Sequence, residues 1–280
     1  MKDGRALVVG GGGVAGIAWA TGVLAGLADG GVDVTDADFL LGTSAGSVVA
    51  AQIGSGAELP ALLQRQVDPA LQKEELKPRD GALAALFEFA EKLDAEVGDP
   101  VERLRRMGGM ALAADTVSEA ERRPVIEGRL PSHSWPERPL GVVAVHAVTG
   151  ETRVFDRASG VGLVDAVAAS CALPGVWPAA TIGEDRYIDG GVRSFTNLDL
   201  AADHARTLVV APMPDPVLEA DAAAIAGRGG LVEVVVPDEA SLAAFGIDPL
   251  SPASRTPAGT AGHAQGRAAA RTIAALWNTP

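Results

Sequence analysis

The sequence has little cysteine, few aromatic residues and a deficit of positive charge. Cys171 is the single cysteine among 280 residues, so no intrachain disulfide can form, which suits a reducing compartment. Aromatic residues make up 4% of the chain and the formal net charge is −13, and both values argue against a nucleic-acid partner. The same charge disfavours electrostatic docking on an anionic membrane, so any transient membrane contact must be apolar and local.

Charged residues are missing between Ala6 and Ala28, a stretch that resembles a signal peptide or a membrane span. Asp3 in the would-be basic region and the run from Gly10 to Gly13 argue against both, because consecutive glycines make a poor helix interior. We therefore expect a buried strand, a glycine loop and a buried helix in a cytoplasmic protein, with secretion by a non-classical route left open. Cleavage near Ala28 would remove the glycine loop, and mass spectrometry of the mature N-terminus would detect it.

Hydrophobic residues make up 48% of the chain and charged residues 21%, which is typical of a globular protein with a substantial core. Two short apolar runs, 6–9 and 39–41, are each followed by a turn and a helical pattern. This order predicts parallel strands joined by right-handed crossovers. Further strands are predicted at 139–145, 152–155, 186–188, 208–211 and 231–236, and helices at 161–172, from about 218, and from about 256 to 277.

Residues 58–130 differ in character, because charges of both signs are dense and helical periodicity dominates. Asp99-Pro100 indicates an N-cap followed by proline at the first helical position. Ser118 and Glu121 have the spacing of a capping box. We predict a helical insertion packed over the sheet edge, serving either as solvated structural helices or as a cap that shapes substrate access.

A Gly-x-Ser-x-Gly turn, formed by Gly42, Ser44 and Gly46, lies between an apolar run and a helical pattern. In this context the turn strains its central residue, and the flanking glycines allow backbone to pass close by. The Ser44 hydroxyl would then lie at a helix N-terminus, which favours developing negative charge. Ser44 is therefore the candidate nucleophile, and the alternative is an ordinary loop rich in glycine and serine.

A serine nucleophile also needs hydrogen-bond donors for the oxyanion. The candidates are the N–H group of Ala45 and those of Gly11, Gly12 and Gly13, because glycine backbone can face a substrate oxygen without interference from a Cβ atom.

The same glycine loop also fits a dinucleotide-binding fingerprint, in the pattern Gly11-x-Gly13-x-x-Gly16. The acidic residue expected about 20 positions later would be Asp33 or Asp36, but neither clearly ends a second strand. This interpretation also leaves the Ser44 turn unexplained.

The base that would accept the serine proton has two kinds of candidate. The histidines, His133, His146, His204 and His263, lie in no glycine-rich or turn motif. A triad of Ser44, Asp189 and either His204 or His263 would suit an ordinary α/β-hydrolase, although little sheet precedes Ser44. Asp189 ends a short strand in an Asp-Gly-Gly turn, and it could accept the proton directly if it is desolvated and within reach.

Three ordered motifs together resemble the patatin-like phospholipases and lipid acyl hydrolases. They are Gly11-Gly12-Gly13-Val14-Ala15-Gly16, Gly42-Thr43-Ser44-Ala45-Gly46 and Asp189-Gly190-Gly191. The block from Ala169 to Pro174, continued by Trp177-Pro178, is similar to the segment that approaches the catalytic aspartate in that family. The resemblance extends from about Leu7 to Asn197.

This resemblance implies one α/β domain over 1–280, with a mainly parallel central sheet, helices on both faces and the helical insertion at about 58–130. It implies a Ser44–Asp189 dyad, an oxyanion hole at the glycine loop, and hydrolysis of lipid or other acyl esters through an acyl-enzyme without metal or cofactor. Ala15 departs from the family, which usually has Arg or Lys there, so oxyanion stabilisation would rest on backbone dipoles. The alternatives are an inactive lipid-binding relative and a dinucleotide-binding α/β protein.

Overall fold

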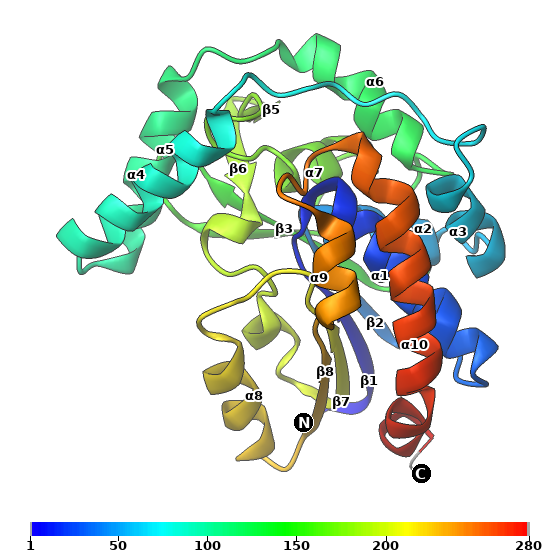
Figure 1. Cartoon of the computed structure of the whole chain (residues 1–280). Coiled ribbons are helices and arrows are strands. Elements are labelled where there is room, and N and C mark those ends of the chain that lie inside the picture. Colours follow the sequence, from blue (N-terminus) through cyan, green and yellow to red (C-terminus); the bar gives the residue numbers. More distant parts are fainter. Residues whose placement is uncertain (1, 279–280) are drawn as a thin grey trace.

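An eight-stranded sheet runs through the protein, and helices cover both of its faces (Figure 1). The computed structural model describes residues 2–278. The strands are β1 (Lys2–Val9), β2 (Phe39–Thr43), β3 (Leu140–His146), β4 (Thr152–Phe155), β5 (Ala180–Ile182), β6 (Asp185–Asp189), β7 (His204–Val210) and β8 (Leu231–Val235). The α-helices are α1 (Gly13–Asp29), α2 (Ala45–Gly54), α3 (Leu59–Val67), α4 (Ala82–Glu96), α5 (Pro100–Ala113), α6 (Glu119–Arg129), α7 (Leu163–Ser170), α8 (Leu218–Ala226), α9 (Glu239–Phe245) and α10 (Arg255–Trp277).

The sheet has the order β5-β6-β3-β2-β1-β7-β8, with β4 paired to β3. Every pairing from β3 through β2, β1 and β7 to β8 is parallel. The strands β4, β5 and β6 pair antiparallel at the other end. The predicted α/β fold is confirmed, and the carboxyl ends of β1 and β2 lie side by side because these strands are parallel neighbours.

Side chains of β1 alternate between two cores, as the pleat of a central strand requires. Leu7 and Val9 pack in the core beneath α1 and α10, while Ala6 and Val8 pack in the core beneath α8. The charge-free stretch of the sequence is thus a central strand followed by α1, which is buried from Val14 to Leu27. Among residues 2–278, no helix is both long and apolar enough to cross a membrane.

Helices α1 and α10 pack closely because glycines line their contact (Figure 1). A Cβ atom added at Gly262 would collide with the backbone of Trp19, and one at Gly266 would collide with that of Val23. Gly26 of α1 faces the backbone of His263 in the same way. Small residues at these positions let the two backbones approach more closely than ordinary side chains allow.

Residues 58–130 contain the helices α3, α4, α5 and α6, which occupy different places in the structure. Helix α3 packs on α1 and α10, and α6 packs on α7, so both belong to the body of the domain. Helices α4 and α5 pack on each other, with α5 against β6, and they project from the body (Figure 1). Asp99 caps α5 by accepting a hydrogen bond from the Val101 N–H at 3.0 Å, and the capping box of Ser118 and Glu121 starts α6, both as predicted.

Candidate active site

Ser44 occupies the sharp turn between β2 and α2, with φ 54° and ψ −120°. A positive φ is unfavourable for a residue with a Cβ atom, and such strain is concentrated at functional sites. Glycine is required on both sides of the turn. A Cβ atom at Gly42 would lie 2.5 Å from the Cα of Ser47, and one at Gly46 would collide with the carbonyl group of Val9.

Neighbouring polar groups hold the backbone of Ser44 in this conformation. Its N–H group donates to Ser170 Oγ at 2.9 Å, and its carbonyl oxygen accepts from Ser47 Oγ at 2.6 Å and from Cys171 Sγ at 3.3 Å. Burial raises the pKa of the Cys171 thiol to about 11, so this side chain remains a neutral donor. Sequence reasoning placed Ser170 and Cys171 near the approach to Asp189 but missed their contacts with the Ser44 turn.

Asp189 ends β6 and is almost completely buried. Its Oδ1 accepts a hydrogen bond from the Gly191 N–H at 2.7 Å. Its Oδ2 is buried and has no hydrogen-bond partner within residues 2–278. Burial raises the pKa of Asp189 to about 7, and the neighbouring Ser44 hydroxyl and the Gly191 N–H partly oppose that rise. The fold therefore brings the predicted serine and aspartate together, with one carboxylate oxygen free to accept a proton.

The glycine loop lies beside Ser44, because a Cβ atom at Gly11 would be 3.4 Å from the Cβ of Ser44. The structure corrects the prediction for Gly11, whose N–H group already donates to the Phe195 carbonyl oxygen at 2.8 Å. The Gly12 N–H has no hydrogen-bond acceptor in the part of the chain that the structure describes. Gly13 and Ala45 are the first residues of α1 and α2, so their N–H groups have no acceptor within their own helices.

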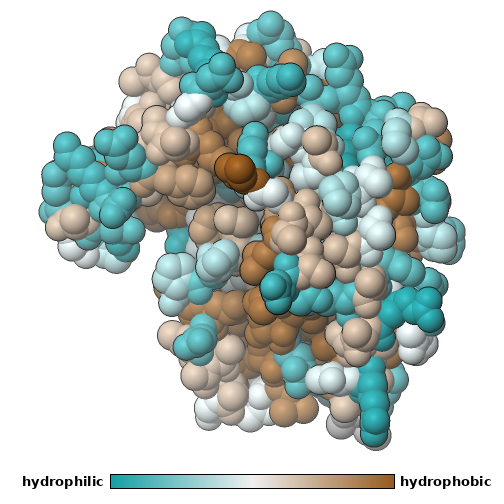
Figure 2. Space-filling view, in the orientation of Figure 1, coloured by the Kyte–Doolittle hydropathy of each residue, from teal (hydrophilic) through white to brown (hydrophobic). Residues whose placement is uncertain are grey.

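A cavity of about 410 Å³ contains Ser44, Asp189 and the glycine loop in its wall. Helices α4 and α5 supply much of its apolar lining, including Leu86, Leu93 and Met107. Figure 2 shows hydrophilic residues at the projecting end of α4 and α5, and hydrophobic residues where these helices meet the body. The helical pair, called the cap below, thus contributes apolar side chains to the cavity that also contains Ser44, and its role in substrate access stays a prediction.

Histidine is absent from the wall of this cavity, although all four histidines lie within residues 2–278. His204 stacks on Phe39, and His263 Nε2 lies 2.8 Å from Asp29 Oδ2 between α10 and α1. The structure therefore offers no histidine for the triad alternative.

The dinucleotide-binding alternative needs an acidic residue near the glycine loop, and neither of its two candidates lies there. Asp33 and Asp36 precede β2, whereas the glycine loop follows β1. Because these strands are parallel, the two acids lie at the opposite edge of the sheet from the loop. Asp33 accepts hydrogen bonds from Thr35, and Asp36 forms an ion pair with Arg5.

The family model described as patatin-like phospholipase matches residues 7–202. The chain belongs to this family. The match includes Ser44, Asp189, the glycine loop and all of the helices α1 to α7, and this family membership supports a lipid hydrolase function. Strands β7 and β8 and helix α10 lie beyond the matched region, yet β7 pairs directly with β1.

Two solved structures resemble this patatin-like protein at low sequence identity. VipD from Legionella pneumophila is 12% identical with a TM-score of 0.49, and the match covers 97% of this chain and 67% of VipD. The type III effector protein ExoU is 15% identical with a TM-score of 0.43, and the match covers 96% of this chain and 53% of ExoU. The comparison with curated proteins found no match.

Proposed function

We propose that this patatin-like protein is a serine acyl hydrolase of the phospholipase or lipid esterase type, with Ser44 as nucleophile and Asp189 as base. The observation that carries the proposal is the pairing of a serine in a strained turn at a helix N-terminus with a buried aspartate in the wall of one apolar cavity. A carboxylate with a pKa of about 7 is a stronger base than an exposed aspartate, whose pKa is near 4.

The proposed reaction has two steps. Ser44 Oγ attacks the ester carbonyl carbon while Asp189 Oδ2 accepts the hydroxyl proton. The tetrahedral intermediate then collapses, the bond to the alcohol oxygen breaks, and that oxygen takes the proton from Asp189. A water molecule attacks the resulting acyl-enzyme, gives its proton to Asp189 and releases the fatty acid, while the proton returns to Ser44 Oγ.

Backbone N–H groups would stabilise the oxyanion in both steps. Gly12, Gly13 and Ala45 supply the donors, and the N-terminal ends of α1 and α2 add favourable dipoles. Ala15 is fully buried in the core, so the basic side chain usual in the family has no counterpart at this position. Gly11 contributes by shaping the loop, since its own N–H group is occupied by Phe195.

The apolar lining supplied by α4 and α5 suits a fatty acyl chain, and lipid or another ester is the proposed substrate. Transient membrane contact and the lack of metal, cofactor and nucleic-acid partners remain predictions.

A fluorophosphonate probe and a panel of phospholipids and simple esters test this proposal. The probe should label Ser44, Ser44→Ala should lower ester hydrolysis by roughly 1,000-fold or more, and Asp189→Asn by about 100-fold or more. Ser55→Ala is a matched control, because the Ser55 hydroxyl bonds the Gln52 carbonyl oxygen at the far end of α2 and does not line the cavity. Hydrolysis that survives Ser44→Ala unchanged would refute the nucleophile, and a folded wild type without hydrolysis or labelling would favour the inactive lipid-binding relative.

A further inference from the structure

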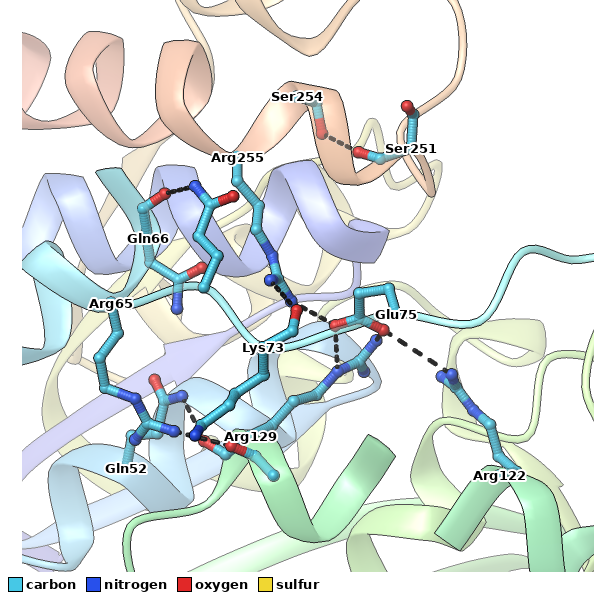
Figure 3. Close-up of polar contacts among 12 residues, drawn as sticks. Gln52, Arg65, Gln66, Lys73, Glu75, Arg122, Arg129, Ser251, Ser254 and Arg255 are labelled. Atoms are coloured by element: carbon cyan, nitrogen blue, oxygen red, sulfur yellow. Dashed lines mark hydrogen bonds and ion pairs between the residues drawn. The ribbon is translucent and has the colours of Figure 1, made fainter. Parts of the chain in front are cut away.

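Three arginines converge on one buried carboxylate, that of Glu75, in the segment between α3 and α4 (Figure 3). Arg129 donates to both carboxylate oxygens, from Nε at 3.0 Å and from Nη2 at 2.7 Å. Arg255 donates to Glu75 Oε1 and to the Lys73 carbonyl oxygen. The two oxygens of Glu75 are therefore already engaged by Arg129 and Arg255.

Arg122 is the third arginine, and its hydrogen bonds are incomplete. Its Nη1 lies 3.9 Å from Glu75 Oε2, which is beyond hydrogen-bonding distance. Its Nε and Nη1 atoms are buried and have no hydrogen-bond partner within residues 2–278. The side chain is 8% exposed, and its guanidinium carbon lies 3.9 Å from the centre of the Trp177 ring. The stacking gives a cation–π contact but no hydrogen-bond acceptor.

The cluster carries more positive than negative charge in a place shielded from water. Three guanidinium groups face one carboxylate, in a chain whose formal net charge is −13. Burial, reinforced by Arg129, lowers the pKa of Arg122 to about 9. A buried charge that lacks partners is costly, so an anion that accepts hydrogen bonds from Arg122 would gain unusually strong interactions.

Part of this cluster lies in the wall of the proposed active-site cavity. Arg122, Arg129 and Glu75 line the same cavity as Ser44 and Asp189. The charges of Arg122, Arg129 and Asp189 all act on the Cys171 thiol, which itself donates to the Ser44 carbonyl oxygen. A molecule held at Ser44 can therefore extend to the arginines without leaving the cavity.

We propose that Arg122 binds an anionic oxyacid group of the ester substrate, a phosphate or a carboxylate, and so makes the enzyme select anionic over neutral acyl esters. The planar guanidinium presents its donors as a fork that matches two oxygens of such a group. Trp177 holds the plane of the guanidinium in place. This inference rests on the proposed function, because it assigns the selectivity of that reaction to one residue.

The test compares three esters with the same acyl chains, each presented as monomers: dioctanoyl phosphatidic acid, dioctanoylglycerol hemisuccinate and neutral dioctanoylglycerol. Arg122→Met should lower kcat/KM for the phosphate ester about 10- to 100-fold, mainly through KM, and change that for the neutral ester less than about threefold. If kcat/KM falls equally for the hemisuccinate, Arg122 binds oxyacid groups in general. If it falls for the phosphate ester alone, Arg122 is specific for phosphate.

Arg123→Met is the matched control, since Arg123 is the next residue of α6, is half exposed and pairs with Glu127 and Asp165 outside the cavity. This substitution should leave the ratios of kcat/KM among the three esters unchanged. An equal loss on charged and neutral esters would show that Arg122 is structural and would overturn the proposal, as would an unchanged ratio. If Arg122→Met does not fold, Arg122→Lys keeps the charge without the fork, and the ratio should then fall about three- to tenfold.

A binding measurement separates failure of this inference from failure of the proposed function. In the Ser44→Ala protein, octyl phosphate should raise the Tm more than octanol does, and the additional substitution Arg122→Met should abolish the difference. Full hydrolysis by Ser44→Ala would refute the nucleophile but leave this binding result intact. Equal effects of octyl phosphate and octanol would refute the anion site while leaving the hydrolase standing.

Discussion

At the scale of single residues, burial sets the pKa of Asp189. An exposed aspartate is ionised well below neutral pH and holds a proton weakly, whereas removal from water raises the pKa of Asp189 to about 7. The Gly191 N–H stabilises the ionised form through Oδ1, which limits the rise. The proposed role of Asp189 as the base for Ser44 relies on this raised pKa, because a carboxylate that titrates near neutral pH holds a proton more strongly than an exposed one.

The pH dependence of hydrolysis should report this pKa. Only ionised Asp189 can accept the serine proton, so kcat/KM should rise about tenfold per pH unit below pH 7 and level off above it. Initial rates on a soluble ester from about pH 5 to pH 9, corrected with the Ser44→Ala protein, measure the profile. A rate that is flat from pH 5 to pH 7 would contradict an Asp189 base with a raised pKa.

At the scale of helices and strands, the largest contact between two helices depends on glycine residues. Helices α1 and α10 meet through Gly22 and Gly26 on one side and Gly259, Gly262 and Gly266 on the other. Helix α1 also carries the glycine loop at its start, so its position against the sheet fixes the proposed oxyanion donors relative to Ser44. A contact more than 200 residues apart in the sequence therefore supports the geometry of the site.

Substituting one of these glycines should destabilise the protein. Gly262→Ala adds a Cβ atom that would collide with the backbone of Trp19, and we expect a loss of about 1 to 3 kcal/mol in the free energy of unfolding. Gly109→Ala is the matched control, because Gly109 is exposed within α5 and an added Cβ has nothing within 4 Å. It should stabilise by roughly 0.5 to 1 kcal/mol. Denaturant titrations measure both, and equal Tm values for the two variants would contradict the close contact.

At the scale of the whole molecule, helix α1 on the sheet is more deeply buried than the helices of the cap, α4 and α5. Helix α1 is buried over nearly its whole length, whereas only Leu86 and Leu93 are buried in α4. Helix α5 buries Met107, Gly108 and Ala111, of which Met107 lines the cavity and Gly108 packs against the backbone of Ala147. Separating the cap from the body would therefore break fewer buried contacts than unfolding the body would.

Amide hydrogen exchange should reveal this difference. Peptides from α4 and α5 should exchange faster than those from α1, α10 and β1, because opening the cap exposes little of the main core. Mass spectrometry of exchange at neutral pH measures the rates peptide by peptide. Equal protection of cap and core peptides would mean that the two unfold as one unit and would exclude independent opening of the cap.

The sequence by itself determined the features that depend on neighbours along the chain. The Ser44 turn needs glycine at positions 42 and 46, and the Asp99 and Ser118 caps act within three residues, so each leaves a short readable pattern. The strand–loop–helix order at both glycine motifs determined the α/β class. The Asp-Gly-Gly turn pointed to Asp189, although its pairing with Ser44 came from the resemblance to the patatin-like family rather than from spacing.

Only the tertiary structure decided the features that join distant segments. It placed Phe195 against the Gly11 N–H, divided the 58–130 insertion between cap and body, and brought Arg122 and Arg255 to Glu75. It also excluded the histidines from the cavity. The physical reason is that burial and hydrogen bonding between remote residues depend on how helices and strands pack, and such contacts leave no periodic trace in the local sequence.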